Sequence, residues 1–558
     1  MKMKGSEILI ETLIDQGVTD IFGYPGGTVL DIYDAIYNRQ DRIHHVLASH
    51  EQHACHAADG YARATGKVGV VLATSGPGST NLVTGIATAM LDSVPIVAIT
   101  GNVGRAMIGK DSFQEVDITG ITLPITKHNY FVNDIDQLEE VVREAFKIAK
   151  SGRPGPVLID IPKDVQNQIG NFQPKGLVRP FGKIAPSQNR IEEAAELINR
   201  CRRPYIYIGG GVISSGIYDE VKEFAEKIDA VIGTSLMGIS AMDTDYNRFL
   251  GMEGMHGHFA SSMAQNDADC LIAIGTRFSD RATGNTKKFA KRASIIHMDV
   301  DFAEINKNVQ TDVGIRGDIS LTLPELIDQV EERKHPEWIA HVNELKRKER
   351  ALEPKATNMT PHAVMDVIND VRKSDSPVAT DVGQHQMWAA QYLKFSKPRT
   401  FITSGGLGTM GFGVGAAIGA AVGTKKPTVL ITGDGSFSMN MNEVIVAVEN
   451  KLPLTIVVLN NGVLGMVRQW QTLFYGKRYS NTVLTGRPID YVKLAEAYGA
   501  KGVVTLTVDA FRDAFTEAYN SGDVTIIDCR IDKDEFVLPM LPPGGAIEDM
   551  ITEKGAEI

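Results

Sequence analysis

The chain has 558 residues, more than one hydrophobic core ordinarily supports, so its length alone predicts about three domains. Its formal net charge of -11 argues against nucleic acid as a partner, and no uninterrupted apolar stretch is long enough to span a membrane. The N-terminus is short and amphipathic, and the four cysteines (Cys55, Cys201, Cys270 and Cys529) contain no Cys-x-x-Cys pair, which indicates a cytoplasmic protein without a disulfide framework.

Short runs rich in Val, Ile and Leu alternate along the chain with segments of helical periodicity. The runs are VGVVLAT, VPIVAIT, PVLIDIP, CLIAIGT, PTVLITG and LTIVVLN. Such runs are typical of parallel strands buried on both faces, and their alternation with helices predicts an α/β protein. Polar, Pro-containing stretches near Gln166–Gln188 and Arg333–Thr360 are predicted to be connectors that divide the chain into three parts.

In the first part, the Ala-rich segment ASHEQHACHAADGYARATG predicts a helix with Glu51 near its start. An acid at this position is most often a solvated charge at a helix N-terminus. We therefore assign Glu51 a functional role only if other segments of the chain indicate a ligand that needs a carboxyl group.

The first and last parts share one layout. The segment from Lys67 reads as strand, Gly turn, helix and a second strand that opens on Pro, and the segment from Lys426 reads in the same way. The later turn carries Asp434, whereas the earlier one has Gly76-Pro77-Gly78. We interpret this as a duplicated fold whose halves hold the two ends of one cofactor; chance similarity between two strand-helix-strand units is the alternative.

The stretch from Gly433 to Asn461, GDGSFSMNMNEVIVAVENKLPLTIVVLNN, places Asp434 and Asn461 27 residues apart across a turn, a helix and a strand. A carboxylate and an amide oxygen suit Mg²⁺, whose remaining ligands would be diphosphate oxygens, a backbone carbonyl and water. Gly433 and Gly435 would let the main chain approach the phosphates. The pattern resembles the thiamine diphosphate (ThDP) signature; an ordinary buried strand-helix-strand unit is the alternative.

A ThDP site would give Glu51 a role. The cofactor's own 4′-imino group removes the thiazolium C2 proton, in a tautomer that forms only when a carboxylic acid hydrogen-bonds the pyrimidine N1′. A buried Glu with a raised pKa meets this need. We therefore expect Glu51 to be buried and to act as the N1′ partner.

A dozen segments, including two already described, occur in a family order. They are IFGYPGGTVLDIYDA, SHEQHA, ATSGPGSTNL, FQEVDITG, SGRPGPVLIDIPKD, GMHG, RFSDRATG, TDVGQHQMWAAQ, GGLGTMGFG, GDGSF, LGMVRQWQ and LPPGGA. Over nearly its whole length the chain thus resembles the catalytic subunits of the biosynthetic acetohydroxyacid synthase (acetolactate synthase) family. The resemblance implies three doubly wound parallel-sheet α/β domains: a pyrimidine-binding domain at 1–165, a central FAD-binding domain at 190–332 and a diphosphate- and Mg²⁺-binding domain at 361–545, followed by a tail at 546–558.

The resemblance implies residues for the ThDP and metal sites. Asp434, Asn461 and the Val463 carbonyl would bind Mg²⁺. Met410 would sit under the bent cofactor, and Gly27 would lie near its aminopyrimidine ring. The other implied ThDP contacts are Gly383, Gln384, His385, Gly408, Gly435, Ser436, Gly465 and Met466.

A second implied group selects the substrates. Met466 and Trp470 lie four residues apart on one helical face, which by itself would predict a core stripe. In the resembling enzymes this Trp packs against the ethyl group of 2-oxobutyrate and favours it over pyruvate. Arg281 would bind the second substrate's carboxylate, for which a surface salt bridge is the alternative. The other residues implied along the access path are Phe113, Gln114, Lys163 and Met255.

The central part carries a Gly triplet after a predicted strand, which alone is weak evidence for a nucleotide site. The resemblance implies FAD there, with no net redox part in the reaction. The implied FAD contacts are Arg153, Gly209, Gly210, Gly211, Met255, His256, Gly275, Arg277, Asp299 and Asp318. Ser279 replaces an acid and Lys110 replaces a Thr of the common family pattern, which affects the expected shape of the flavin pocket and entry channel.

The implied reaction is decarboxylation of pyruvate on ThDP, followed by attack of the hydroxyethyl carbanion on pyruvate or 2-oxobutyrate. The products are 2-acetolactate and 2-aceto-2-hydroxybutyrate, precursors of the branched-chain amino acids. Three alternatives stand beside this interpretation: an FAD-dependent pyruvate oxidase, a catabolic acetolactate synthase without flavin, and a non-enzymatic cofactor-binding homologue. The presence of Glu51, Asp434 and Asn461 argues against the last.

The resemblance also implies partners. In this family ThDP lies between the first domain of one subunit and the third domain of another, so a homodimer or a dimer of dimers is expected. A separate small regulatory subunit is implied as well. The C-terminal segment PMLPPGGAIEDMITEKGAEI has the composition of a mobile tail; in the family such a tail folds over the active site, and disorder without function is the alternative.

Overall fold

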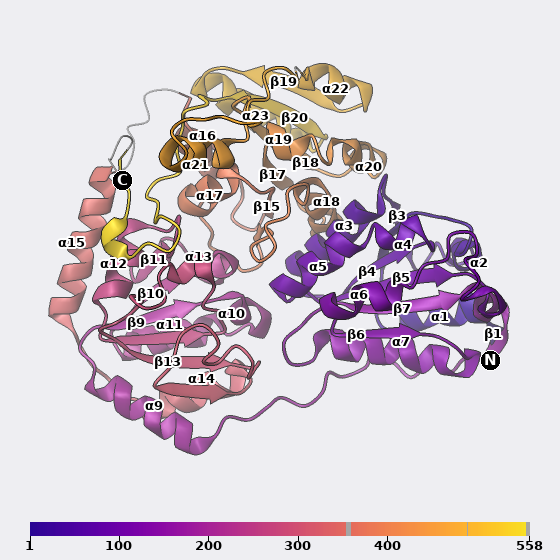
Figure 1. Ribbon diagram of the computed structural model, residues 1–558, viewed down its shortest axis with the longest axis horizontal. Helices are drawn as coiled ribbons and strands as arrows, with labels where there is room; N and C mark the ends of the chain where they lie inside the picture. The colour runs from indigo at the N-terminus through magenta and orange to yellow at the C-terminus, as the bar shows by residue number, and fades with distance from the viewer. Residues whose placement is uncertain (353–358, 488, 554–558) are drawn as a thin grey trace.

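The computed structural model describes residues 1–352, 359–487 and 489–553. These residues form three α/β domains in chain order, each built on a six-stranded sheet with helices on both faces (Figure 1). All neighbouring strands within the three sheets are parallel. The prediction of three doubly wound parallel-sheet domains is therefore confirmed.

The N-terminal sheet has the strand order β3-β2-β4-β5-β7-β6. Its strands are β2 (Asp20–Gly23), β3 (His44–Leu47), β4 (Gly69–Ala73), β5 (Ile96–Asn102), β6 (His128–Phe131) and β7 (Val157–Pro162). Its helices are α1 (Gly5–Asp15), α2 (Leu30–Tyr37), α3 (Glu51–Thr65), α4 (Pro77–Thr80), α5 (Val83–Asp92), α6 (Ile118–Thr122), α7 (Ile135–Lys150) and α8 (Lys163–Asn167), with 3-10 turns η1 (Arg105–Met107) and η2 (Leu123–Ile125). A separate antiparallel pair joins β1 (Lys2–Lys4) to β8 (Ile169–Asn171).

The central sheet has the order β11-β10-β9-β12-β13-β14. Its strands are β9 (Pro204–Ile208), β10 (Val231–Thr234), β11 (Phe249–Met252), β12 (Cys270–Ile274), β13 (Ser294–Asp299) and β14 (Val313–Arg316). Its helices are α9 (Gln188–Arg200), α10 (Gly210–Ser215), α11 (Tyr218–Lys227), α12 (Phe259–Asp267), α13 (Asp280–Thr283), α14 (Ile319–Gln329) and α15 (Pro336–Leu352), with the 3-10 turn η3 (Leu236–Ala241).

The C-terminal sheet has the order β16-β15-β17-β18-β20-β19. Its strands are β15 (Val378–Thr380), β16 (Phe401–Ile402), β17 (Thr428–Gly433), β18 (Leu454–Asn460), β19 (Lys501–Thr505) and β20 (Thr525–Arg530). Its helices are α16 (Pro361–Val371), α17 (Gln384–Tyr392), α18 (Gly413–Thr424), α19 (Asp434–Phe437), α20 (Val444–Glu449), α21 (Gly465–Phe474), α22 (Tyr491–Ala497) and α23 (Val508–Ser521), with 3-10 turns η4 (Met441–Glu443) and η5 (Ile547–Asp549).

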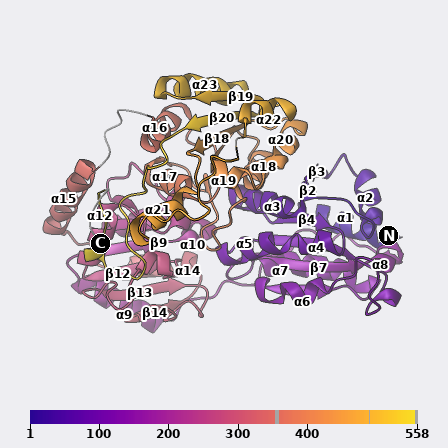
Figure 2. The same cartoon turned by 45° about the horizontal axis from the view of Figure 1, so that its top comes forward.

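The first and last sheets have equivalent topologies. Strands β4 and β17 occupy the same place in their sheets, and so do β5 and β18. These are the strands that the two similar sequence segments predict, so the shared layout extends to the whole sheet. Helices α3 and α18 pack against each other between the two domains, as Figures 1 and 2 both show, and their buried side chains belong to one continuous hydrophobic core.

The predicted second connector is wrong over most of its length. Residues Pro336–Leu352 form α15, whose side chains Trp338, Val342 and Leu345 are buried against the central domain. Its apolar positions are masked in the sequence by the charged residues between them. Residues 353–358 of this connector lie outside the described residues. The first connector holds the end of α8 and β8 and then runs without regular structure to α9, across the lower edge of Figure 1.

The C-terminal segment is packed as far as Ile551. Met540 and Ile551 pair their main chains, and the Leu541 amide donates to the Met255 carbonyl at 2.7 Å. The segment therefore packs on the central domain beside Met255, a predicted substrate residue. Its last five residues lie outside the described part. Within the described ranges, no helix combines the length and apolarity needed to cross a membrane.

Candidate active site

A cavity of about 1830 Å³ lies at the junction of the three domains. Its wall comes from the end of α5, from the turns that follow β9 and β12, from the loop between β16 and α18, and from α21. The predicted site residues that line it are Arg153, Gly210, Gly211, Met255, His256, Gly275, Arg277, Arg281, Asp299, Asp318, Gly383, Gly408, Met410, Met466 and Trp470. Residues predicted for FAD, for ThDP and for the substrates therefore line one cavity.

The predicted metal residues follow adjacent strands. Asp434 comes directly after β17 and Asn461 directly after β18, and these strands are paired in parallel up to Gly433 and Leu459. Asp434 is buried, and burial raises the pKa of its carboxyl to about 6, although amide hydrogen bonds oppose the shift. The Val463 amide donates to Asn461 Oδ1 at 3.2 Å. Carboxylate, amide and carbonyl oxygens are the donors that Mg²⁺ prefers, so these residues fit the ion.

A Gly-rich cradle lies next to these residues. Gly383 has φ +154° at the start of α17, and Gly408 has φ +66°, a conformation that favours Gly. His385 is buried, its Nε2 has no partner among the described residues, and burial lowers its pKa to about 3. Its neutral ring nitrogen is therefore available to a ligand. The Ser436 hydroxyl donates to the Val382 carbonyl at 2.7 Å, while a side chain at Gly435 or Gly465 would overlap Leu464 or Gln384.

The predicted substrate residues meet at one end of the cavity. The Arg281 guanidinium lies over the Trp470 ring, with Cζ 5.7 Å from the ring centroid, and its Nη1 is 3.4 Å from Met255 Sδ. The Arg281 side chain is 61% exposed, and its Nε forms a long ion pair with Asp280 Oδ2 at 3.8 Å. Because this ion pair is exposed and weak, the guanidinium can still take a second carboxylate beside the flat aromatic wall. Met466 lies one turn before Trp470 on the same wall.

The residues predicted to bind FAD differ in whether they line the cavity and whether they already have partners. Gly210 lines the cavity, but Gly209 does not, because it packs against the turn at Gly275. Arg153 is engaged by Asp301 at 3.1 Å and by Glu304 at 2.7 Å. Three buried polar atoms on the wall have no partner among the described residues: His256 Nδ1, Tyr207 Oη and Thr276 Oγ1. Orphaned polar atoms of this kind fit a bound polar ligand. Asp318 caps α14, and burial raises the pKa of Asp299 to about 6.

The predicted residues that do not line this cavity fall into two groups. One is the metal and diphosphate group described above (Gln384, His385, Asp434, Gly435, Ser436, Asn461, Val463 and Gly465), with Gly209 beside the cavity wall. The other group belongs to the N-terminal domain. Glu51, Gly27, Phe113, Gln114 and Lys163 follow β3, β2, β5 and β7, whose carboxyl ends share one edge of the N-terminal sheet. Lys163 Nζ donates to the Gly27 carbonyl at 3.0 Å. Gln114 packs beside Gly76, and Phe113 is 86% exposed.

Glu51 lies in this second group at the start of α3. Its Oε2 accepts a hydrogen bond from Asn81 at 2.9 Å. The side chain is half-buried, so the expected full burial is absent from the single chain. The C-terminal domain of the same chain reaches the residues just before Glu51, where the Ser49 amide donates to Glu443 Oε2 at 3.1 Å, but it leaves the Glu51 side chain half-buried. The single chain therefore presents two partial sites.

Comparisons with known proteins agree with this architecture. Three thiamine pyrophosphate enzyme models match the chain: the N-terminal TPP binding domain at residues 3–121, the central domain at 191–326 and the C-terminal TPP binding domain at 381–529. The chain is 44% identical to the acetolactate synthase isozyme 2 large subunit of Escherichia coli (strain K12) over 552 residues, covering 98% of this chain and 99% of that protein. It is 42% identical to the acetolactate synthase large subunit of Buchnera aphidicola over 566 residues, 99% of both chains.

The chain belongs to the family of acetolactate synthase large subunits. In this family member, sequence reasoning missed groups whose partners come from distant segments. Asp381 is fully buried and accepts hydrogen bonds from the amides of Gly411 and Gly413 and from Asn440. Arg63 and Asp92 join two domains across more than 300 positions of sequence. No local pattern signals such contacts, because each residue also reads as an ordinary helix charge.

Proposed function

We propose that the protein forms 2-acetolactate from two molecules of pyruvate, or 2-aceto-2-hydroxybutyrate from pyruvate and 2-oxobutyrate. The observation that carries the proposal is the convergence of Arg281, Trp470 and Met410 on one cavity beside the turns at Gly383 and Gly408. The similarity to acetolactate synthase large subunits along almost the whole chain supports it. No observation favours an oxidase, a catabolic synthase or a non-enzymatic homologue.

The cofactors would be ThDP and Mg²⁺. When bound, ThDP supplies a carbon nucleophile and an electron sink for the decarboxylation. Asp434, Asn461 and the Val463 carbonyl would hold the metal, and a cation there would lower the pKa of Asp434 and keep it ionised. Asn461 Nδ2 lies 3.4 Å from Gln384 Oε1, which directs the amide oxygen of Asn461 away from Gln384. The Glu51 carboxyl would be the hydrogen-bonding partner of the pyrimidine ring.

The substrate acids would bind at the Trp470 end of the cavity. The Arg281 guanidinium offers two parallel N–H groups to a carboxylate. The Trp470 ring would contact the extra methyl group of 2-oxobutyrate, a preference on the order of 1 kcal/mol. Met255 and Met466 would add apolar surface at this end of the cavity, which would limit the access of water to the reacting atoms.

The central domain would hold FAD. The unpartnered atoms of His256, Tyr207 and Thr276 and the open turn at Gly210 support this assignment. Arg153 would contribute only if it left its ion pairs with Asp301 and Glu304. We assign residues 1–165 to pyrimidine binding, 190–332 to FAD, and 361–545 to diphosphate and metal, with the tail from 546 covering the site.

We also infer partners and location. The two partial sites support a homodimer, or a dimer of dimers, in which two chains complete each active site. The relatives are named large subunits, which supports a small regulatory subunit as a further partner. All four cysteines are free, which supports a cytoplasmic location.

The first test is product analysis of the purified protein with ThDP, Mg²⁺, FAD and pyruvate, with and without 2-oxobutyrate. We expect acetolactate from pyruvate alone and mainly 2-aceto-2-hydroxybutyrate when both acids are present. Acetate or acetyl phosphate with reduced flavin would identify an oxidase. Full activity without flavin would identify the catabolic type, and no turnover would leave only a binding fold.

The role of Trp470 is tested by Trp470→Ala. Because the ring would contribute on the order of 1 kcal/mol, the preference for 2-oxobutyrate should fall roughly fivefold while acetolactate formation continues. Phe474→Ala is the matched control, since Phe474 packs edge-on against Trp470 on the same helix but does not line the cavity. An unchanged product ratio in Trp470→Ala would remove Trp470 from substrate selection.

A further inference from the structure

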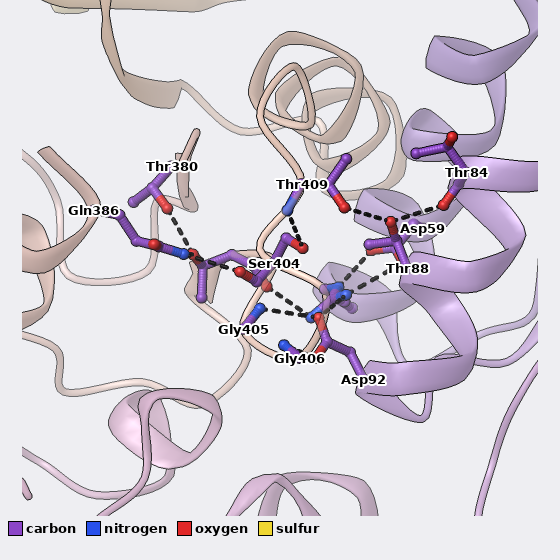
Figure 3. A network of polar contacts seen from close by, with 12 residues as sticks. Asp59, Thr84, Thr88, Asp92, Thr380, Gln386, Ser404, Gly405, Gly406 and Thr409 are labelled. Atoms are coloured by element: carbon purple, nitrogen blue, oxygen red, sulfur yellow. Dashed lines mark hydrogen bonds and ion pairs between the residues drawn. The ribbon is translucent and has the colours of Figure 1, made fainter. Parts of the chain in front are cut away.

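The loop between β16 and α18 carries five residues of the cavity wall, among them the predicted cofactor residues Gly408 and Met410. It belongs to the C-terminal domain but lies against α3 and α5 of the N-terminal domain. Figure 3 shows a polar network in which these helices and the loop meet. The position of the loop therefore depends on residues that precede it by more than 300 positions.

Asp92 accepts hydrogen bonds from the first half of the loop. Its Oδ1 accepts a hydrogen bond from the Gly406 amide at 2.7 Å, and its Oδ2 accepts one from the Gly405 amide at 3.1 Å (Figure 3). Its side chain is fully buried. A carboxylate bound to two consecutive amides fixes the direction of the main chain, and such charge-assisted bonds are stronger than neutral ones.

Arg63 connects Asp92 to both ends of the loop. Its guanidinium donates to Asp92 Oδ2 at 2.9 Å and to the Thr403 carbonyl at 2.9 Å. It also bonds the buried Asp59 one turn earlier on α3, and its Cζ lies 5.4 Å from the centroid of Phe412. Because both carboxylates are buried, Arg63 supplies the positive charge that keeps them stable.

Thr88 holds the second half of the loop. Its Oγ1 lies 2.8 Å from Thr409 Oγ1 and donates to the Thr84 carbonyl at 2.9 Å. Since the single proton of Thr88 goes to Thr84, the Thr409 hydroxyl must be the donor between the two. Thr409 stands between Gly408 and Met410, so this bond acts directly beside the cavity.

The C-terminal domain fixes the opposite side of the loop. Gln386 Nε2 donates to Thr403 Oγ1 at 2.7 Å and to the Ser404 carbonyl at 3.0 Å. The Ser404 hydroxyl in turn accepts from the Thr409 amide at 3.1 Å. The loop is thus clamped from two domains, and its orientation responds to a change on either side.

We propose that Asp92, Arg63 and Thr88 are positioning residues for the reaction: they fix residues 403–411 so that Gly408 and Met410 meet the bound cofactor in the reactive geometry. This inference rests on the proposed function. None of the three needs to touch the reacting atoms. Their effect passes through the main chain of the loop, and it makes the C-terminal half of the site depend on the N-terminal domain of the same chain.

The test uses two variants in the full-length enzyme. Asp92→Asn removes the charge and one of the two amide acceptors, and Thr88→Val keeps the side-chain volume but removes the hydroxyl that accepts from Thr409. We expect kcat to fall roughly 10- to 100-fold in Asp92→Asn and less in Thr88→Val, because small displacements of positioned groups reduce rates on this scale. The ThDP dissociation constant, measured by fluorescence titration with Mg²⁺, should rise while KM for pyruvate changes little.

Two control variants separate positioning from stability. Arg143→Met breaks a similarly buried network, since Arg143 bonds Asp15 and Glu139 within the N-terminal domain, far in sequence from the loop. Thr122→Val removes a buried hydroxyl that donates to the carbonyl four residues earlier, as Thr88 does. Both controls should lower the melting temperature as much as the test variants do, yet leave kcat and the ThDP dissociation constant unchanged.

Amide hydrogen exchange gives a readout that does not require turnover. Peptides that contain Gly405 and Gly406 should exchange faster in Asp92→Asn than in wild type, and no faster in Arg143→Met. Equal exchange and equal ThDP affinity in test and control variants would overturn the positioning role. If wild type makes no acetolactate, the proposed function fails, while the exchange and ThDP-binding results still decide the role of the network.

Discussion

Glu253 illustrates at the scale of one residue how burial controls a proton. Its side chain is 5% exposed, and the Tyr205 hydroxyl donates to its Oε2 at 2.8 Å. Its Oε1 has no partner among the described residues. Burial raises the pKa of this carboxyl from 4.5 to about 8, so the neutral acid is the stable form in the folded protein.

This shift makes stability depend on pH. Between pH 4.5 and about 8 the unfolded chain ionises Glu253 while the folded chain keeps its proton, so the contribution to stability is fully present below 4.5 and is lost as pH rises toward 8. The free energy of unfolding of Glu253→Gln, measured in urea, should therefore rise relative to that of wild type by up to about 1.4 kcal/mol for each pH unit between pH 6 and pH 8. Glu140→Gln, at an exposed carboxyl, should show no such gain. Parallel pH profiles for wild type and Glu253→Gln would contradict the prediction.

At the scale of elements, the crossing of α3 and α18 holds the first and last domains together. A Cβ atom on Gly419 would overlap the Ala57 carbonyl oxygen, and one on Gly60 would overlap the Ala416 carbonyl oxygen. The two helix backbones therefore approach as closely as Gly allows, and the surrounding core is densely packed.

We predict that Gly419→Ala destabilises the protein by about 1–3 kcal/mol, because the helices must move apart to accept the added methyl group. Chemical unfolding measures the effect. Gly182→Ala is the control, since nothing lies within 4 Å of its added Cβ. A Gly419→Ala protein as stable as this control would show that the helix contact adjusts freely.

The apolar runs of the sequence predicted several strands, because the position of these strands depends on local sequence. The apolar runs identified β4, β5, β7, β12, β17 and β18, because a strand buried on both faces must be apolar throughout. They also predicted that Asp434 and Asn461 each follow a strand, and in the structure these strands, β17 and β18, are parallel neighbours. Helix α15 was missed because its buried stripe is narrow within a charged sequence. The hydrogen bonds that Gly405 and Gly406 donate to Asp92 could not be predicted, because these residues are more than 300 positions apart and no periodic pattern links them.

At the scale of the whole molecule, the proposed homodimer would bring the two partial sites of different chains together. The edge that carries Glu51 and Gln114 also exposes the apolar side chains of Met107 and Phe113 in the segment that follows β5. Exposed apolar groups beside candidate catalytic residues are typical of a surface that a partner covers. A second chain that brings its Asp434 end to this edge would bury Glu51 fully and supply the missing side.

This arrangement predicts complementation between inactive variants. Glu51→Gln and Asp434→Ala should each abolish activity alone. In a mixed dimer one site carries both substitutions and the other carries none, and random pairing makes half of the dimers mixed, so coexpression should restore about a quarter of wild-type activity. Glu51→Gln with Gln114→Ala is the matched control: both changes lie in the N-terminal partial site, every site of a mixed dimer is then defective, and no comparable recovery should occur. If each chain built its site from its own Glu51 and Asp434, coexpression of the first pair would restore nothing, because every site would keep one of the two substitutions.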